Sequence, residues 1–169
     1  CPMTTIFDTG LDKNSANYVP LSPLSFLYRT ARTFPEHTAM IHGQTRRSWS
    51  ETAQRCRRLA SALTGRGIRP SDTVAVMAPN IPELFEVHFG VPMTGAVLNA
   101  LNIRLDAATL AYILDHGEAK VLFTDTEFAP VIQEALHQCK GDPLVIDIDD
   151  SEGPGGERLG SILYDELLA

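Results

Sequence analysis

The glycine-rich loops that most often bind phosphate are absent from this sequence. Neither G-x-G-x-x-G nor G-x-x-x-x-G-K-[ST] occurs anywhere in the 169 residues. The stretch Gly153-Pro154-Gly155-Gly156 has the composition of such a loop, but it lacks the lysine and the strand-to-helix context, so we interpret it as a solvated loop. No serine lies in a G-x-S-x-G motif. The sequence therefore offers no local motif for phosphate binding or for a serine nucleophile.

Metal binding is also poorly supported by residue spacing. Asp147, Asp149, Asp150 and Glu152 form an acidic cluster, but an EF-hand loop counted from Asp147 would place Glu152 at its obligatory glycine. We interpret the cluster as a strand end that opens into solvent. No two histidines have H-E-x-x-H spacing and none has a CxxC motif nearby, so no zinc site is predicted. We expect His88 to be a packed, hydrogen-bonded core residue.

The composition is that of an ordinary globular domain, with 44% hydrophobic and 21% charged residues. A formal net charge of -7 provides no basic surface for a nucleic acid, so nucleic acid is not an expected partner. Proline, glycine or a polar residue interrupts every long apolar run, and we expect no membrane-spanning helix. The three cysteines, Cys1, Cys56 and Cys139, do not suit a disulfide framework and indicate free thiols in a reducing cytoplasm.

The first part of the chain is expected to form an arm, a helix and a β-hairpin. Residues 1–20 are polar and lack periodicity, and we interpret them as a flexible arm. Apolar residues at helical spacing follow, up to the Phe34-Pro35 pair. Residues 38–42 and 46–49 are typical of two strands joined by the turn Gly43-Gln44.

A capping box predicts the next helix, because Ser48 and Glu51 have the S-x-x-E spacing. Cys56 falls on the apolar face of this helix, where a thiol behaves as a small hydrophobic group. Three arginines lie mostly off that face, and we interpret them as a solvated surface and not as an anion site: Arg55, Arg57 and Arg58.

Strand and helix signals then alternate along the chain. Asn80 and Asp106 are predicted helix N-caps, and Gly117 is a predicted C′ glycine. The helix over residues 81–93 is apolar nearly all round and should be buried on more than one side. This alternation implies βαβ units, hence an α/β fold with a mostly parallel sheet, flanking helices and an N-terminal β-hairpin. The predicted strands cover residues 73–77, 96–99, 121–124 and 144–148, and a short closing helix is expected over residues 161–168.

One long segment is more informative than these patterns. Residues 74–123 read VAVMAPNIPELFEVHFGVPMTGAVLNALNIRLDAATLAYILDHGEAKVLF. This segment resembles the AMP-forming acyl-CoA synthetases of the adenylate-forming superfamily, in VAVMAPN with its N-x-P-E-L helix start, in GAVLNALNIRLDA and in the Leu-Asp-His-Gly turn before VLF. Residues 48–63, SWSETAQRCRRLASAL, resemble the first core segment of the same family. The resemblance covers residues 21 to about 168 and is diagnostic when these segments are taken together.

The resemblance implies a two-step reaction. A carboxylic acid attacks the α-phosphate of Mg·ATP to give an acyl-adenylate, and the thiol of coenzyme A then expels AMP. ATP, magnesium and coenzyme A are thus implied for a full-length enzyme of fatty acid metabolism, acting on a short- or medium-chain fatty acid or an aryl acid. Residues 21–169 would be a partial N-terminal, AMP-binding domain that ends before the phosphate-binding loop. We therefore expect this chain alone to bind no cofactor and to be inactive.

Arg104 is the single site residue that the resemblance suggests. In this family the coenzyme A nucleotide passes near the helix that follows NIRLDA, and a guanidinium suits its phosphates. The alternative is that Arg104 pairs locally and fixes the exit of the preceding strand. No catalytic residue and no metal ligand is carried over to this chain.

Two other hypotheses stay open at this point. The chain could be a small flavodoxin-like ligand-binding module, against which the missing phosphate loop counts, or a non-catalytic oligomerisation domain. If it is instead part of a larger enzyme, surfaces that the remainder would cover are open. We then expect self-association through apolar residues of the helix over 81–93: Leu84, Phe85, Val87, Phe89 or Val91.

Overall fold

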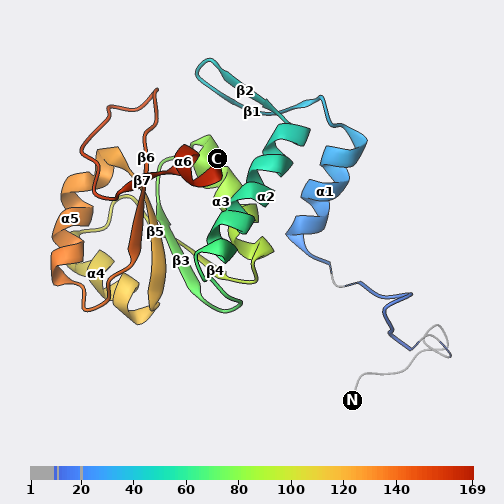
Figure 1. Ribbon diagram of the computed structural model, residues 1–169, viewed down its shortest axis with the longest axis horizontal. Coiled ribbons are helices and arrows are strands. Elements are labelled where there is room, and N and C mark those ends of the chain that lie inside the picture. Colours follow the sequence, from blue (N-terminus) through green and yellow to red (C-terminus); the bar gives the residue numbers. More distant parts are fainter. Residues whose placement is uncertain (1–9, 11, 20) are drawn as a thin grey trace.

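The computed structural model describes residues 10, 12–19 and 21–169, and it shows an α/β fold with a small hairpin beside it (Figure 1). The arm predicted over residues 1–20 falls largely outside the described residues. A five-stranded sheet forms the centre in the order β4-β3-β5-β6-β7, and every neighbouring pair of strands is parallel. The predicted fold class is therefore confirmed. The strands are β3 (Thr73–Met77), β4 (Val97–Ala100), β5 (Ala119–Asp125), β6 (Leu144–Ile148) and β7 (Ile162–Leu163).

Helices cover both faces of this sheet. Helices α2, α3 and α6 pack on one face, while α4 and α5 pack on the other. Helix α1 contributes Leu27 to a separate small core with α2. The helices are α1 (Pro23–Thr33), α2 (Trp49–Gly65), α3 (Pro82–Met93), α4 (Ala107–His116), the short η2 (Thr126–Phe128), α5 (Ala129–Gln138) and α6 (Tyr164–Leu168).

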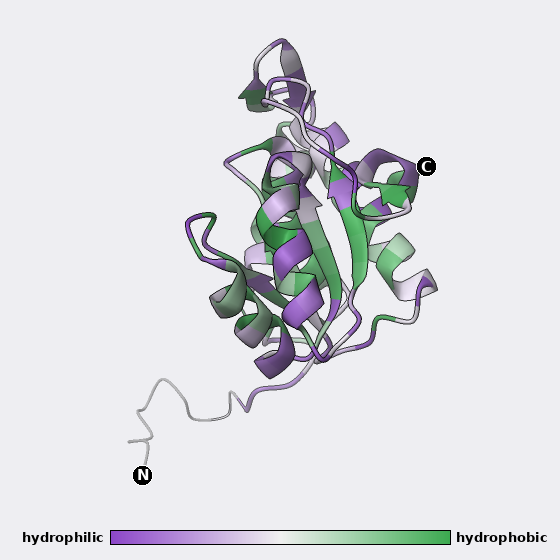
Figure 2. Cartoon of the chain, turned by 90° about the vertical axis from the view of Figure 1, so that its left-hand side faces the viewer, coloured by the Kyte–Doolittle hydropathy of each residue, from purple (hydrophilic) through white to green (hydrophobic). Residues whose placement is uncertain are grey.

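Alternation along β3 explains why two separate cores form. Successive side chains of a strand point to opposite faces. Val74 and Val76 belong to the core under α2, α3 and α6, whereas Ala75 and Met77 belong to the core under α4 and α5. Figure 2 shows the hydrophobic strands inside the molecule, with hydrophilic residues on the outer sides of the helices.

Helix α3 is enclosed as its composition predicted, although its start differs by one residue. Val87 and Val91 are fully buried against the sheet. The N-cap is Ile81 and not Asn80, and no side chain caps the helix. The reason is Pro82, whose fixed φ suits the first helical position and makes the preceding residue the cap.

Two other local predictions need correction. Gly117 has a φ of -82°, and it is the following residue, Glu118, that takes the left-handed conformation with a φ of 48°. Within the predicted closing helix, Ile162 and Leu163 form the strand β7, which pairs with Ile146 and Asp147 of β6. A strand of two residues is too short to show a periodic pattern in the sequence.

The antiparallel hairpin consists of β1 (Thr38–His42) and β2 (Thr45–Ser48). Its two-residue turn begins with Gly43, whose φ of 52° suits glycine. Trp49 is the first residue of α2 and not the end of the strand, because Ser48 is already the helix cap. The predicted capping box is present: Glu51 N–H donates to Ser48 Oγ at 3.2 Å, and Ser48 N–H donates to Glu51 Oε2 at 2.7 Å.

Replacing Gly90 with alanine should lower the free energy of unfolding by about 1–3 kcal/mol. Helices α2 and α3 approach closely here, and a Cβ on Gly90 would lie 2.6 Å from Cδ2 of the fully buried Leu59. Urea unfolding of the chain followed by circular dichroism measures the change. Gly65→Ala is the matched control, because Gly65 is also helical and a Cβ there meets no atom within 4 Å. Equal stability of Gly90→Ala and the unsubstituted chain would contradict the close helix approach.

Candidate functional site

The carboxyl ends of the parallel strands meet at one edge of the sheet, which is where ligands bind in doubly wound folds. Strands β4 and β5 flank β3, so the switch point of the topology lies at β3. Arg104 lies at this edge, exposed, in the connection between β4 and α4. Its backbone N–H donates to Oδ1 of Asn102 at 2.9 Å. Within the described part of the chain its guanidinium makes no hydrogen bond or ion pair, so the side chain does not form the local pairing considered above.

The end of β5 and the start of η2 place two buried polar side chains at the same edge. Asp125 and Thr126 are each only 2% exposed. Asp125 Oδ1 accepts the N–H of Glu127 at 3.0 Å, whereas Asp125 Oδ2 and Thr126 Oγ1 have no hydrogen-bond partner among the described residues. Burial raises the pKa of Asp125 to about 6; the hydrogen bond from Glu127 opposes this rise, and the charges of Glu127 and Asp150 add to it.

The segment of residues 149–160, here called the strap, covers the end of β5. A Cβ on Gly156 would overlap the carbonyl oxygen of Thr126, so the strap passes directly over that residue. At its far end, the N–H groups of Leu159 and Gly160 donate to the two carboxylate oxygens of Asp147 at 3.1 and 2.8 Å. Asp147 is fully buried, which corrects the prediction that this acidic cluster simply opens into solvent.

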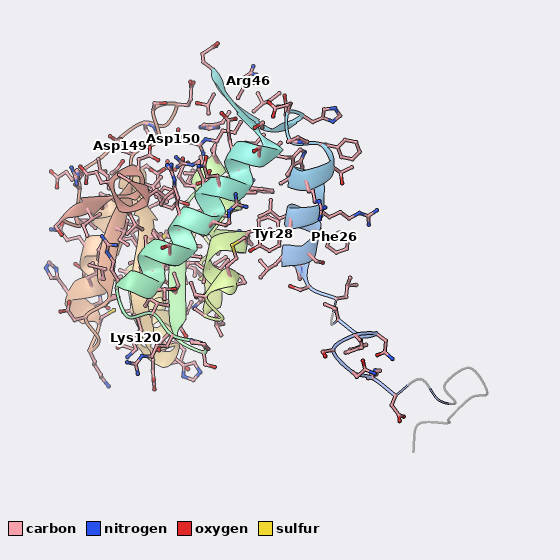
Figure 3. The ribbon with its side chains drawn as sticks, turned by 45° about the vertical axis from the view of Figure 1, so that its right-hand side comes forward. Phe26, Tyr28, Arg46, Lys120, Asp149 and Asp150 are labelled. Atoms are coloured by element: carbon pink, nitrogen blue, oxygen red, sulfur yellow. The ribbon has the colours of Figure 1, made fainter. Side chains whose placement is uncertain are left out.

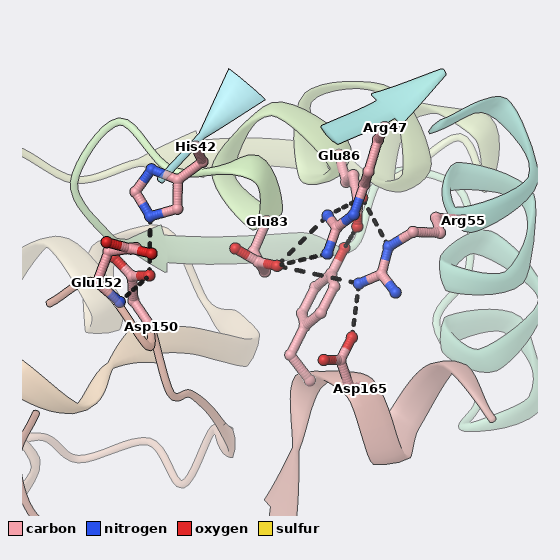
Figure 4. Close-up of polar contacts among 9 residues, drawn as sticks. His42, Arg47, Arg55, Glu83, Glu86, Asp150, Glu152 and Asp165 are labelled. Carbon is pink, nitrogen blue, oxygen red and sulfur yellow. Dashed lines mark hydrogen bonds and ion pairs between the residues drawn. The ribbon is translucent and has the colours of Figure 1, made fainter. Parts of the chain in front are cut away.

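The near end of the strap is attached to the hairpin. His42 Nε2 lies 2.8 Å from Asp150 Oδ1 (Figure 4). The same oxygen accepts the N–H of Glu152 at 3.1 Å. The strap is therefore held at both ends, by the hairpin and by β6.

A buried carboxylate joins the helices beside this edge. Glu86 of α3 is fully buried, and its Oε1 accepts hydrogen bonds from Arg47 Nη1 and Arg55 Nε, each at 2.7 Å (Figure 4). Its Oε2 accepts the hydroxyl of Tyr164 at 3.0 Å. Glu83 lies 3.4 Å from Arg47 and 4.0 Å from Arg55, so it is a weaker second partner. One carboxylate thus connects the hairpin, α2, α3 and α6.

Glu86 was not identified from the sequence, and Arg55 was wrongly interpreted as solvated. The side chain of Arg55 is only 21% exposed and also pairs with Asp165 at 2.6 Å. Arg57 and Arg58 are exposed, as predicted. The signal that could have revealed the network is a glutamate in the middle of an apolar helix, since a buried carboxylate requires charged or hydrogen-bonding partners.

Burial shifts the titration of the groups in this network. Desolvation raises the pKa of Glu86, although the guanidiniums of Arg55 and Arg47 oppose the rise. Burial alone would lower the pKa of Arg55, but its hydrogen bond to Glu86 raises it above the ordinary value. Desolvation raises the pKa of Tyr164 well above its usual range and that of Cys56 to about 12. Cys56 is therefore a protonated, small apolar group, in agreement with the sequence interpretation.

An apolar groove of about 490 Å³ lies between the hairpin and the first half of α3. Ile41, Leu84, Phe85 and Phe89 contribute to its lining. Of the five residues proposed for self-association, Leu84, Phe85 and Phe89 thus reach the surface. The other two, Val87 and Val91, are in the core. The association itself stays a prediction.

The sequence of the chain matches the family model described as "AMP-binding enzyme" over residues 27–161, well over half of its length. The chain belongs to the AMP-binding enzyme family. The resemblance carried by residues 48–63 and 74–123 is thereby confirmed, and so is the predicted fold, because structural neighbours in this family share it.

Relatives within the AMP-binding enzyme family are named as acid–CoA ligases. The chain is 48% identical over 152 residues to the peroxisomal butyrate–CoA ligase of Arabidopsis thaliana, in a match covering 85% of this chain and 27% of the relative. It is 51% identical over 126 residues to the peroxisomal acetate/butyrate–CoA ligase of the same plant. That match covers 75% of this chain and 22% of the relative. A crystal structure of an anthranilate CoA ligase in complex with anthranoyl-AMP has the same fold, with a TM-score of 0.79 and 20% sequence identity. The match covers 89% of this chain and 28% of the ligase. The chain therefore spans about a quarter of the length of the relatives it matches.

Other site predictions can now be placed on the AMP-binding scaffold. His88 is exposed and not a core residue, because α3 buries the positions of Glu86, Val87, Gly90 and Val91 and directs His88 away from them. In the described residues, no three His, Cys, Asp or Glu side chains are arranged to hold a metal ion. None of the helices in this part of the chain has the length and apolar character needed to cross a bilayer.

Replacing Glu86 with glutamine should lower the free energy of unfolding by about 3 kcal/mol, because two guanidiniums and a phenol lose their shared buried anion. Urea unfolding at pH 7 measures the effect. Glu83→Gln on the same helix is the control, and its longer contacts should contribute less than about 1 kcal/mol. Equal effects of the two substitutions would show that Glu86 has no special role in connecting the elements.

Replacing Asp125 with asparagine should stabilise the chain at pH 8 but not at pH 4. The folded-state pKa of about 6 lies above the ordinary value of 3.8, so the ionised form disfavours folding, increasingly as the pH rises from about 4 to above 6. Asparagine keeps the oxygen that caps η2 and removes the charge, for a gain of up to about 3 kcal/mol at pH 8. Urea unfolding at both pH values tests this. Asp142→Asn is the control, because it removes an exposed carboxylate that is not among the charges acting on Asp125. A pH-independent effect of Asp125→Asn would refute the burial argument.

Proposed function

We propose that this chain is part of an acid–CoA ligase that converts a short-chain fatty acid, ATP and coenzyme A into acyl-CoA, AMP and pyrophosphate. The observation that carries the proposal is the 48% identity to a butyrate–CoA ligase over 152 residues. In the first step a carboxylate oxygen attacks the α-phosphate and pyrophosphate leaves. In the second, the thiol of coenzyme A attacks the acyl carbon and AMP leaves. The activity is proposed for a whole ligase and not for these residues alone.

Arg104 is the residue of this chain that fits coenzyme A. Its exposed guanidinium lies at the ligand-binding edge of the sheet without a partner among the described residues, and it can form charge-assisted hydrogen bonds to a phosphate. Neighbouring hydrogen bonds fix its loop: Asn102 accepts the N–H of Arg104, and Asp106 accepts the N–H of Thr109 at 2.8 Å. We propose that Arg104 binds and orients coenzyme A before the thiol attacks.

In residues 10, 12–19 and 21–169 no three His, Cys, Asp or Glu side chains are grouped to hold a metal ion, and we derive no step through magnesium. ATP and magnesium would be bound by other parts of a whole ligase.

The relatives also bear on substrate and compartment. Butyrate and acetate are named for two of the plant relatives, and benzoate and cinnamate for two others at 50% and 48% identity, so an aryl acid is the second candidate substrate. The first two of these enzymes are peroxisomal by name, and a cytoplasmic location of this chain stays a prediction from its cysteines. Family membership favours the ligase over the flavodoxin-like module and over the oligomerisation domain.

The 169-residue chain alone should not exchange pyrophosphate into ATP with any carboxylic acid. The sequence contains neither of the glycine-rich loops that would position the phosphates of ATP for attack by a carboxylate, so we expect no acyl-adenylate to form. An ATP–pyrophosphate exchange assay with acetate, butyrate and benzoate tests this, with a boiled sample as the background. Exchange above the boiled sample would contradict the expectation and favour a self-sufficient enzyme.

Replacing Arg104 with glutamine in a whole ligase that contains this chain should raise the KM for coenzyme A about tenfold, the effect of losing one charge-assisted contact of about 1.4 kcal/mol. Butyrate-dependent ATP–pyrophosphate exchange should be unchanged, because adenylation precedes coenzyme A binding. Arg58→Gln, which removes an exposed charge from α2, is the control. An unchanged KM for coenzyme A would show that Arg104 does not bind coenzyme A. If the unsubstituted enzyme showed no butyrate-dependent ATP–pyrophosphate exchange, the proposed ligase activity would itself be refuted.

A further inference from the structure

Charge is distributed unevenly between the two edges of the sheet. The chain has a formal net charge of -7, and Asp149 and Asp150 follow β6 at the carboxyl edge. Lys120, near the start of β5, lies at the opposite end of the molecule (Figure 3). We therefore expect a site at the amino edge to favour an anionic ligand.

A cavity of about 390 Å³ opens at this amino edge. Arg66 and Arg69, from the connection between α2 and β3, line it together with Lys120. Ile68 and Val121 form a buried apolar floor, at 7% and 1% exposure. Three residues with cationic side chains, from two separate segments, thus line one hollow.

The three cations are not neutralised by the protein. In the described part of the chain none of them forms an ion pair, and the guanidinium of Arg66 donates only one hydrogen bond, from Nη1 to the carbonyl oxygen of Ala62 at 3.3 Å. Asp72 is the only carboxylate in the lining, and its Oδ2 accepts the backbone N–H of Arg69 at 2.8 Å. Like charges that converge in this way repel one another, and a bound anion would remove that repulsion.

The backbone beneath the cations is held in place. Lys120 lies within β5, in the middle of the sheet. The turn that carries Arg69 is fixed by its bond to Asp72 and by the N–H of Ser71, which donates to the carbonyl oxygen of Gly95 at 2.9 Å. Ser71 has a φ of 74°, and Gly67 has a φ of 87°, so the chain reverses tightly on both sides of Arg69. The backbone that carries the three side chains is therefore fixed, so binding an anion need not order a flexible loop, and this lowers the cost of binding.

We propose that this cavity binds an oligophosphate, with the pyrophosphate group as the smallest ligand that matches three cations. Two guanidiniums and one ammonium can donate to the oxygens of two linked phosphates, and arginine suits such oxygens because of its planar fork. A free pyrophosphate ion and the phosphate chain of a nucleotide share this chemistry. The site is distinct from Arg104, which lies at the other edge of the sheet. It does not depend on the ligase assignment.

Titration calorimetry of the 169-residue chain with sodium pyrophosphate at low ionic strength tests the proposal. We expect one binding site, and we expect Arg69→Gln and Lys120→Gln each to raise Kd about tenfold. Both side chains are exposed, so the variants should keep the unfolding midpoint of the original chain, which urea unfolding checks. Arg57→Gln, which removes an exposed charge elsewhere on α2, should leave Kd unchanged.

Titrations with ATP and with coenzyme A distinguish the sources of the phosphate. Weaker binding of either compound to Lys120→Gln assigns its phosphates to the cavity. Absence of binding heat with pyrophosphate would overturn the proposal. It would also be overturned if Arg57→Gln weakened binding as much as Lys120→Gln, because the attraction would then come from general surface charge.

Discussion

The arrangement of this chain depends on the burial of one carboxylate. Glu86 is fully buried on α3, where it would be strongly unfavourable without partners. Its partners come from three other segments, the hairpin, α2 and α6, so the carboxylate is satisfied only when all of them are in place. The hydrophobic cores hold the sheet and its helices together, but apolar contacts are not directional. The hydrogen bonds to Glu86 are directional, and they determine how the hairpin and α6 are positioned on α3.

The two edges of the sheet differ in the ligands that they could accept. The carboxyl edge carries Arg104 and the carboxylates of Asp125, Asp149 and Asp150, and the strap covers the end of β5. At the amino edge three cations line an open cavity. A parallel sheet gives each strand two chemically different ends, and the segments following and preceding the strands can therefore evolve separate binding properties. In this chain the apolar middle of the sheet separates the two regions.

Features that depend on neighbouring residues were predictable from the sequence, whereas those formed by distant residues were not. The bounds of β3 and β6, the Ser48 capping box and the Asp106 cap follow from residues a few positions apart. The Glu86 network involves partners as far as 78 positions away, which no local pattern encodes. His88 was placed in the core because α3 is apolar nearly all round, which conceals the face that points outward. The role proposed for Arg104 came from family resemblance, since composition and spacing alone gave no site.

The surroundings of Cys56 make this residue a natural reporter of the folded state. Its thiol is fully buried, donates to the carbonyl oxygen of Glu86 at 3.6 Å and has its pKa raised to about 12. Alkylating reagents need an accessible thiolate, so they can modify this position only when α2 separates from α3. Cys139 at the end of α5 is partly accessible and should react earlier. The order in which these two sulfur atoms acquire a label would record the opening of the helix pair, without any engineered dye or tag.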